Sequence, residues 1–422
     1  MSPPQARIEP IERFRLDNGL RVVLHADRSL PLVAVNLWYD VGSRNERPGK
    51  TGLAHLFEHM LFQGSAHVGT NDHFRYVQQV GGVANGSTWF DRTNYYETLP
   101  SHYLDLGLWL ESDRMGFFLP ALTEEKLATQ RDVVLNERRQ RVDNQPYGRA
   151  FERLHELLYP EGHPYRWPVI GYEEDIAGAS MEDVAAFFGA YYVPNNAVLT
   201  LAGDFDPEQA RDRVAVYFAD IPAGPPVEQP LPLPPETPSE TRETLIDAVE
   251  LPRIYMGYPG PGYGEPEWYA GDLLSIALAD GKSSPMYEDL VYRRQLAKNV
   301  GVQTLPTSLA ATFLVVATAN DGVEPGELEE AVGEHLTAAA EGLDEALVSR
   351  AKERLRTEWW EELQSLDQRA DLLSSFTIRF DDPERLNREA RTYLDLTSEQ
   401  LSGFARRVLR DERRAVLTVV PE

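Results

Sequence analysis

Two histidines and a glutamate stand close together in the segment His55–His59, which reads His-Leu-Phe-Glu-His. The neighbouring residues are almost all apolar, so the stretch 51–63 is predicted to be a buried helix. On a helix His55 and His59 lie one turn apart on the same side, and the carboxylate of Glu58 lies beside them. Burying this much polarity is costly unless something binds it. A zinc ion would bind both imidazoles and leave Glu58 to handle a proton, so the segment predicts a zinc site.

A zinc site of this kind needs a third protein ligand and keeps a fourth position for water. The chain contains no cysteine, so the third ligand must be a histidine or a carboxylate. His67 and His73 are close in sequence but belong to a polar turn region. Glu137 is the better candidate, because it falls on the same side of its predicted helix as Val133 and Val134. A buried ion pair between Glu137 and an arginine is the alternative.

The composition is that of an acidic globular chain. Its 422 residues are too many for one ordinary core, so two or more domains are expected. With 41 basic and 67 acidic residues the net charge is −26, which argues against a nucleic-acid partner. Residues 1–15 are polar and no run approaches ~18 apolar residues, so we expect no secretory signal, no membrane span and a cytoplasmic location.

A proline-rich stretch divides the chain into halves of similar size. We predict an N-terminal zinc-binding domain over 1–220, a linker over 221–244, and a related C-terminal domain without the zinc motif over 245–422. Ala-Val-Leu-Thr occurs at 197–200 and again at 415–418, each time after a predicted helix. Four matching residues alone can arise by chance, but the matching context favours a duplication.

Each half mixes strands with helices. Strands are predicted at 19–25 and 32–39, and helices at 51–63, 71–80, 101–118, 124–141, 266–279, 284–296, 325–341 and 344–366. The expected fold class is α+β, with two related domains that are each a mostly antiparallel sheet with helices on one face.

The chain resembles the pitrilysin, insulysin and mitochondrial processing peptidase family. His-x-x-Glu-His inverts the commoner zinc-protease motif, and Glu137 follows its last histidine by 78 residues. The likeness also covers these segments: Gly81–Thr88, Asp91–Tyr96, Arg131–Glu137, His163–Tyr165, Tyr192–Asn196 and Gly281–Tyr287. The resemblance implies that His55, His59 and Glu137 bind zinc, that Glu58 is the catalytic base, and that the two domains form half of a clamshell.

Residues 81–99 are predicted to bind the peptide substrate. Glycines and an asparagine precede an aromatic, threonine-rich strand, and such an edge could pair with an extended peptide. The resemblance implies that Asn85, Gly86 and Ser87 bind the substrate backbone. A hairpin that only packs against its neighbours is the alternative.

Two places depart from the pattern of that family. Members often carry a glutamate two helical turns before the third ligand, where this chain has Gln130, which we expect to orient a ligand by hydrogen bonding. Self-sufficient members also carry an Arg and a Tyr seven residues apart in the second half, and the matching positions here are Val291 and Lys298. Tyr292 and Arg293 are nearby but out of register, and a shifted alignment would restore the pair.

With these departures the chain resembles the zinc-bearing subunit of the short, two-subunit bacterial type of this family. It would be a zinc metalloendopeptidase that cleaves extended peptides with a zinc-bound water and Glu58 as general base. A homologous partner subunit would supply the Arg/Tyr pair in a heterodimer. Two alternatives stay open: a catalytically silent structural subunit, and a self-sufficient homodimeric peptidase.

Overall fold

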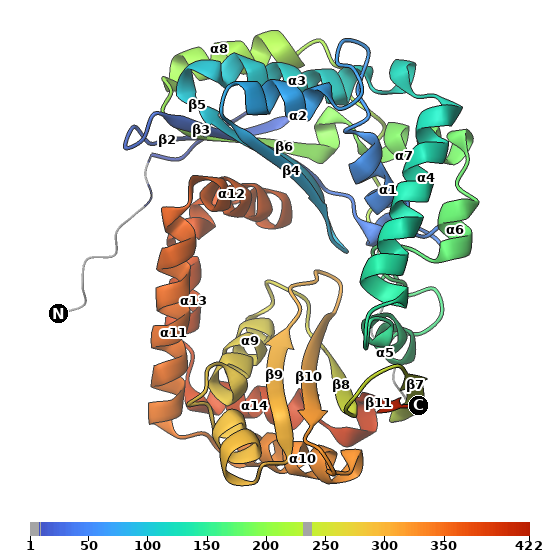
Figure 1. The fold of residues 1–422 in the computed structure, drawn as a ribbon. Helices are drawn as coiled ribbons and strands as arrows, with labels where there is room; N and C mark the ends of the chain where they lie inside the picture. Colours follow the sequence, from blue (N-terminus) through green and yellow to red (C-terminus); the bar gives the residue numbers. More distant parts are fainter. Residues whose placement is uncertain (1–7, 9, 231–238) are drawn as a thin grey trace, which may run out of the picture. The chain divides into compact units, whose positions relative to one another are not determined.

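The computed structural model of the chain describes residue 8 and residues 10–230 and 239–422 (Figure 1). The chain forms two compact units. The first unit is formed by the described residues within 1–136, 169–230 and 360–389, and the second by the described residues within 137–168, 231–359 and 390–422. No helix of the described part is both long and apolar enough to cross a membrane.

The first unit is built on a six-stranded sheet with the order β1-β2-β6-β3-β5-β4. Its strands are β1 (Glu12–Arg15), β2 (Arg21–Ala26), β3 (Leu32–Tyr39), β4 (Val83–Thr88), β5 (Thr93–Pro100) and β6 (Ala197–Gly203). Only β2 and β6 run parallel, and all the other neighbours are antiparallel. The predicted strands at 19–25 and 32–39 correspond to β2 and β3, the latter with the predicted ends.

Helices cover both faces of this sheet. They are α1 (Leu53–Met60), α2 (Asp72–Gln79), α3 (Leu104–Phe117), α4 (Glu124–Arg138, of which 137 and 138 fall past the unit boundary), α6 (Glu173–Ala177), α7 (Met181–Tyr191), α8 (Pro207–Phe218) and α12 (Leu366–Phe380). Odd-numbered residues of β3, such as Val33 and Val35, join the main core with α1 and α3. Even-numbered Ala34 faces the other way and packs with Ala370 of α12.

The second unit has a five-stranded sheet with the order β7-β11-β8-β10-β9. Its strands are β7 (Thr241–Asp247), β8 (Arg253–Gly260), β9 (Ala297–Thr304), β10 (Ala311–Ala319) and β11 (Ala415–Pro421). Its helices are α5 (Ala150–Leu158), α9 (Pro266–Ala279), α10 (Pro325–Glu341), α11 (Glu345–Gln364, reaching the first unit at Trp360), α13 (Glu389–Leu394) and α14 (Ser398–Val408). Tyr258 and Phe313 form a core with α9, α10 and α14, whereas Gly257 lies close to Leu154 and Leu158 of α5 on the opposite face.

The two sheets share one strand plan, which confirms the expected pair of related α+β domains. The order β2-β6-β3-β5-β4 corresponds to β7-β11-β8-β10-β9, and β6 and β11 each have one parallel and one antiparallel neighbour. Both copies of Ala-Val-Leu-Thr lie at the start of these central strands. One detail of the expectation is wrong, because helices lie on both faces of each sheet rather than on one.

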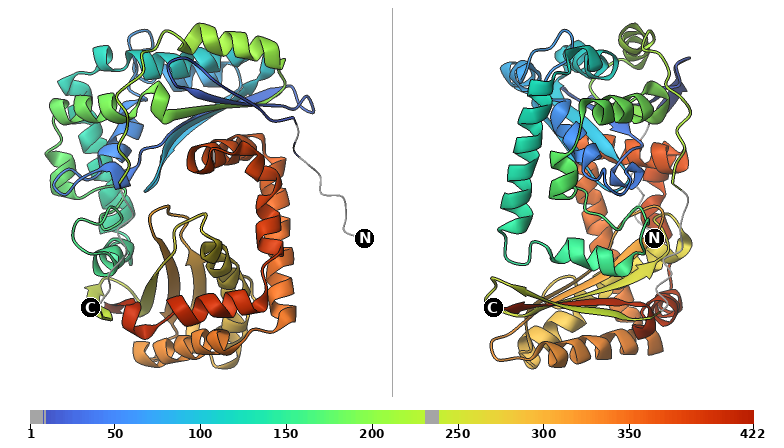
Figure 2. Two further views of the ribbon diagram at one scale, coloured as in Figure 1. Left: turned by 180° about the vertical axis from the view of Figure 1, so that it is seen from behind. Right: turned by 90° about the vertical axis from the view of Figure 1, so that its right-hand side faces the viewer.

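The second face of each sheet is covered by a helix from the other half of the sequence. Helix α12 packs on β6 and β3 of the first unit, and α5 packs on β11 and β8 of the second (Figures 1 and 2). The predicted division at 1–220 and 245–422 stays a prediction. Each compact unit contains residues from both halves of the sequence. Within the predicted linker 221–244, residues 231–238 lie outside the described residues, and β7 already begins at Thr241.

Candidate metal centre

Helix α1 is held firmly at its N-terminus. Gly52, which precedes it, has φ 83°, and a side chain there would collide with the backbone oxygen of Ile170 at 2.7 Å. The Glu46 carboxylate accepts hydrogen bonds from the backbone N–H groups of Gly52 (2.9 Å) and Ala54 (2.8 Å). These bonds satisfy donors that the first helical turn leaves unpaired, and the negative charge suits the positive end of the helix.

The histidines of α1 lie on its partly exposed side, whereas Phe57 and Met60 are fully buried. The ring centroids of His55 and His59 are 4.8 Å apart, with an interplanar angle of 76°. One ligand atom from each ring and one carboxylate oxygen of Glu137 all lie within 4.8 Å of one another. The structure therefore brings together the three predicted ligands.

Glu137 is placed by α4, which runs unbroken through the unit boundary. Val134, one turn earlier on the same face, is fully buried in the first-unit core. Val133 was expected on that buried side too, but it is 40% exposed, so only Val134 marks the face. Glu137 also forms a 2.7 Å ion pair with Arg141, whose side chain is 75% exposed, so the pair is not the buried one that the alternative required.

The donor set suits zinc. Two imidazole nitrogens and one carboxylate oxygen are typical ligands of a catalytic zinc, which keeps a further position open. Neither His67 nor His73 joins the group: His67 binds Asp113 through Nδ1 at 2.5 Å, and His73 belongs to a separate buried cluster.

Glu58 lies beside this group and is oriented by the neighbouring strand β4. Its Oε2 accepts a 2.7 Å hydrogen bond from the hydroxyl of Thr88. Gly86, on the same face of β4, lies so close that a Cβ atom would stand 3.2 Å from Cγ of Glu58 and 3.1 Å from the ring of Phe62. The glycine therefore allows the strand to pass directly against α1.

Strand β4 is the outermost strand of its sheet, as predicted, and among the described strands it pairs with β5 alone. Asn85 is exposed, whereas Ser87 is half-buried and held by two hydrogen bonds. The hydroxyl of Ser87 donates to Oδ1 of Asn94 at 2.6 Å and accepts from Nη1 of Arg92 at 2.6 Å. The strand thus packs well and still presents an edge.

The remaining predicted positions are not members of this group. Gln130 is 5% exposed on α4, two turns before Glu137. Val291 lies in the π-helical segment Tyr287–Arg293 of the second unit, which falls within the helix expected at 284–296, and Lys298 is exposed on β9.

Sequence reasoning missed the contributions of Glu46 and Thr88. Thr88 stands two residues after Gly86, so strand periodicity could have placed both on the face toward α1. Glu46 gave no comparable signal, because its role depends on a turn before the helix.

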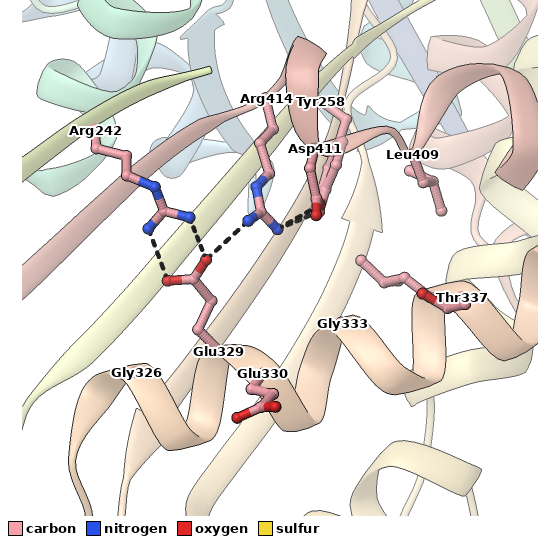
Figure 3. Close-up of a pocket in the computed structure, with 11 residues that line it drawn as sticks. Arg242, Tyr258, Gly326, Glu329, Glu330, Gly333, Thr337, Leu409, Asp411 and Arg414 are labelled. Carbon is pink, nitrogen blue, oxygen red and sulfur yellow. Dashed lines mark hydrogen bonds and ion pairs between the residues drawn. The ribbon is translucent and has the colours of Figure 1, made fainter.

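A pocket of about 400 Å³ in the second unit offers a different chemistry (Figure 3). Its two arginines are already neutralised: Arg242 binds both oxygens of Glu329 at 3.0 and 2.7 Å, and Arg414 binds Glu329 at 2.9 Å and Asp411 at 2.8 Å. Its arginines therefore offer no uncompensated positive charge to a ligand.

Comparison with known proteins gives consistent results over nearly the whole chain. The protein-family model described as "Insulinase (Peptidase family M16)" matches residues 21–166, and the one described as "Peptidase M16 inactive domain" matches residues 178–355. The zinc protease PqqE of Helicobacter pylori is 29% identical over 99% of this chain and 94% of its own length. A probable mitochondrial-processing peptidase subunit beta of Arabidopsis thaliana is 24% identical over 85% of this chain and 67% of its own length. The crystal structure of a protease from Helicobacter pylori superposes with a TM-score of 0.92 at 27% identity, covering 98% of this chain and all of that one.

Proposed function

Because the chain belongs to the peptidase M16 family, we propose that it is a zinc-dependent peptidase that hydrolyses extended peptides. The observation that carries the proposal is the convergence of His55, His59 and Glu137 beside the carboxylate of Glu58. Relatives named zinc proteases support the same reading.

The three converging side chains would hold the zinc ion, which supplies a Lewis acid when it is bound. Glu58 acts as the general base: its carboxylate accepts the proton of the attacking water and passes it to the leaving amine. The hydroxyl of Thr88 donates to Oε2 of Glu58 and so helps to orient that carboxylate. Gln130, buried on the helix that carries Glu137, is proposed to help orient a ligand.

The substrate binds along β4 as an additional strand. An outermost strand offers main-chain donors and acceptors to an extended peptide, which suits binding without strong sequence preference. Asn85, Gly86 and Ser87 form the central part of that edge, and Gly86 brings it within contact of Glu58. A peptide paired there would run past the general base.

A second subunit is proposed to complete the active site. Stabilising the developing oxyanion is often worth several kcal/mol, and this chain has Val291 and Lys298 where self-sufficient members are expected to carry Arg and Tyr. We propose a homologous partner that bears this pair. A homodimer that is active by itself and a silent structural subunit are the competing candidates.

The decisive experiment measures zinc content and peptide hydrolysis of the purified chain, alone and mixed with a relative that carries the Arg/Tyr pair. Zinc binding with activity only in the mixture supports the two-subunit enzyme. Full activity of the chain alone would favour the homodimer, and zinc-free, inert protein in both samples would favour the structural subunit.

A further inference from the structure

A second cluster of ionisable side chains lies fully inside the first unit, between α2, β5 and α3. His73 is 3% exposed, Glu97 1%, Glu111 0% and Arg114 2%. One ligand atom from each of His73, Glu97 and Glu111 lies within 4.8 Å of the others. Such polarity inside a core is expensive unless charges and hydrogen bonds are matched.

The charges of this cluster do not balance if both glutamates are ionised. Nη2 of Arg114 lies 3.5 Å from Oε1 of Glu111 and 2.7 Å from Nδ1 of His73. Burial, and then the charge of Arg114, lowers the pKa of His73 well below its usual value, so His73 is neutral. Tyr39, the other titratable group that faces Glu111, is neutral as well, since burial raises its pKa well above the ordinary value. One positive charge therefore faces two carboxyl groups.

The hydrogen bonding of the two carboxyl groups is also incomplete if both are ionised. With both glutamates ionised, none of the four carboxyl oxygens has a donor with hydrogen-bond geometry among the described residues. Leaving buried acceptors unpaired costs about 1–3 kcal/mol each. A single proton between the carboxyl groups supplies the missing donor and removes one negative charge. Burial raises the pKa of both glutamates, and the charge of Glu111 raises that of Glu97 further, well above its usual value, so the pair retains a proton.

A metal ion would be the other way to balance two carboxylates. His73, Glu97 and Glu111 have suitable ligand atoms, but Nη2 of Arg114 already lies 2.7 Å from Nδ1 of His73 and 3.5 Å from Oε1 of Glu111. It donates to the imidazole and lies beside Glu111, and its charge repels a cation. The arrangement favours a proton.

We propose that Glu97 and Glu111 share one proton, so that the pair carries a single negative charge. This charge holds Arg114 in place, and Arg114 in turn is a positioning residue for the peptide-binding edge. The second part rests on the proposed function, whereas the first does not.

Arg114 reaches the active site through two aromatic rings. Its guanidinium lies 4.2 Å from the ring centroid of Tyr95 and 4.7 Å from that of Phe62. These rings are the surfaces against which Gly86 packs, at 3.3 and 3.1 Å for a Cβ atom built there. Tyr95 also donates a 3.3 Å hydrogen bond to the backbone oxygen of Phe57, the residue before Glu58. A planar cation under both rings therefore sets the separation of β4 and α1.

The shared proton is tested by thermal unfolding of the full chain between pH 6 and pH 9. A buried acid with a raised pKa loses stability as the pH rises from its usual value of 4.5 toward the raised one. Glu97→Gln keeps the shape and a donor for Glu111 without this titration, so its Tm should rise relative to wild type as the pH increases. Glu97→Gln/Glu111→Gln leaves Arg114 without a counter-charge and should lower Tm by roughly 5 °C or more. Glu125→Gln, on the exposed start of α4, is the control.

Parallel Tm curves for wild type and Glu97→Gln would overturn the shared proton. Two divalent ions per wild-type chain, with one lost in Glu97→Gln, would overturn it in favour of a metal site.

The positioning role is tested with Arg114→Lys, which keeps the charge but loses the flat guanidinium. We expect kcat/KM for peptide hydrolysis to fall at least tenfold with zinc content unchanged. Arg211→Lys is the matched control, because Arg211 lies 4.2 Å over the ring of Phe14, and that variant should keep its activity. Unchanged activity of Arg114→Lys would overturn the positioning role. If wild type hydrolyses no peptide, alone or with a partner, the proposed function and this role fall together, and the unfolding curves still decide the shared proton.

Discussion

The hydroxyl of Thr88 donates a 2.7 Å hydrogen bond to Oε2 of Glu58, and so ties the proposed general base to the strand proposed to bind the peptide. Thr88 and Gly86 lie on one face of β4, and both meet Glu58. The proposed sites of substrate binding and proton transfer are therefore connected through a single short strand.

Removing that hydrogen bond should slow the reaction without removing the metal. Thr88→Val keeps the shape of the side chain and loses the donor, and a hydrogen bond to a charged group is worth about 1.5–3 kcal/mol. We expect kcat to fall by roughly tenfold or more, with zinc content unchanged and activity largely restored in Thr88→Ser. Thr129→Val, at an exposed position of α4, is the control. A wild-type kcat in Thr88→Val would show that Glu58 needs no such support.

Glu58→Gln tests the base itself. The amide cannot accept the proton of the attacking water, so kcat should fall by roughly 10²–10⁴. His55 and His59 are untouched, so metal analysis should find the wild-type zinc content. Appreciable residual turnover would assign the proton to another group.

Gly86→Ala should disturb the contact between β4 and α1. The new Cβ would lie 3.1 Å from Phe62, 3.2 Å from Glu58 and 3.3 Å from Tyr95, which is tighter than ordinary packing. We expect a rise in KM and a fall in kcat, measured on an extended peptide. Gly189→Ala on α7 is the matched control, since its Cβ meets no atom within 4 Å, and it should leave both constants unchanged. Equal kinetics for the two variants would contradict the close approach.

The local part of the site could be predicted from the sequence because helices and strands repeat with fixed periods. The spacing of His55, Glu58 and His59 placed them beside one another, and the helix around Glu137 gave it an inward side. Strand signals likewise predicted β3 and the edge at Asn85. Val133 shows the limit of this reasoning, since an apolar residue next to a buried one is itself 40% exposed.

Long-range packing could not be predicted in the same way. Helix α12 covers the first-unit sheet from more than 150 residues away in sequence, where Asp371 accepts hydrogen bonds from Trp38 at 2.7 Å and Asn94 at 2.9 Å. The buried cluster also joins separate elements, because Glu97 lies on β5 and Glu111 on α3. Neither sequence periodicity nor motif spacing relates such pairs, so only the folded chain reveals them.

Glu137→Gln should reduce zinc binding. The carboxamide is a weaker ligand than the carboxylate that completes the group with His55 and His59. We expect the zinc content after gel filtration to fall well below one ion per chain, and a chelator to abolish the activity of the wild type. Glu125→Gln, at the exposed start of the same helix, should retain the wild-type content. A fully loaded Glu137→Gln chain would point to a different third ligand.

The contact between Asp27 and helix α12 should make the thermal stability of the protein decrease at acid pH. Burial opposes ionisation of this carboxyl group, but hydrogen bonds from Ser29 and Arg369 outweigh it and lower the pKa of Asp27 to about 2. The 2.7 Å contact between Asp27 and Arg369 joins the residue that follows β2 to α12. A lowered pKa means that this stabilisation is complete above the usual value of 3.8 and is lost as the pH falls toward 2. Asp27→Asn should therefore unfold at a lower temperature than wild type at pH 7, and the difference should shrink below about pH 4.

Asp206→Asn, which removes a carboxylate from an exposed 3.8 Å pair with Arg28, should change Tm little at either pH. A difference between wild type and Asp27→Asn that stays constant from pH 7 to pH 3 would show that the ion pair does not hold α12 on the sheet.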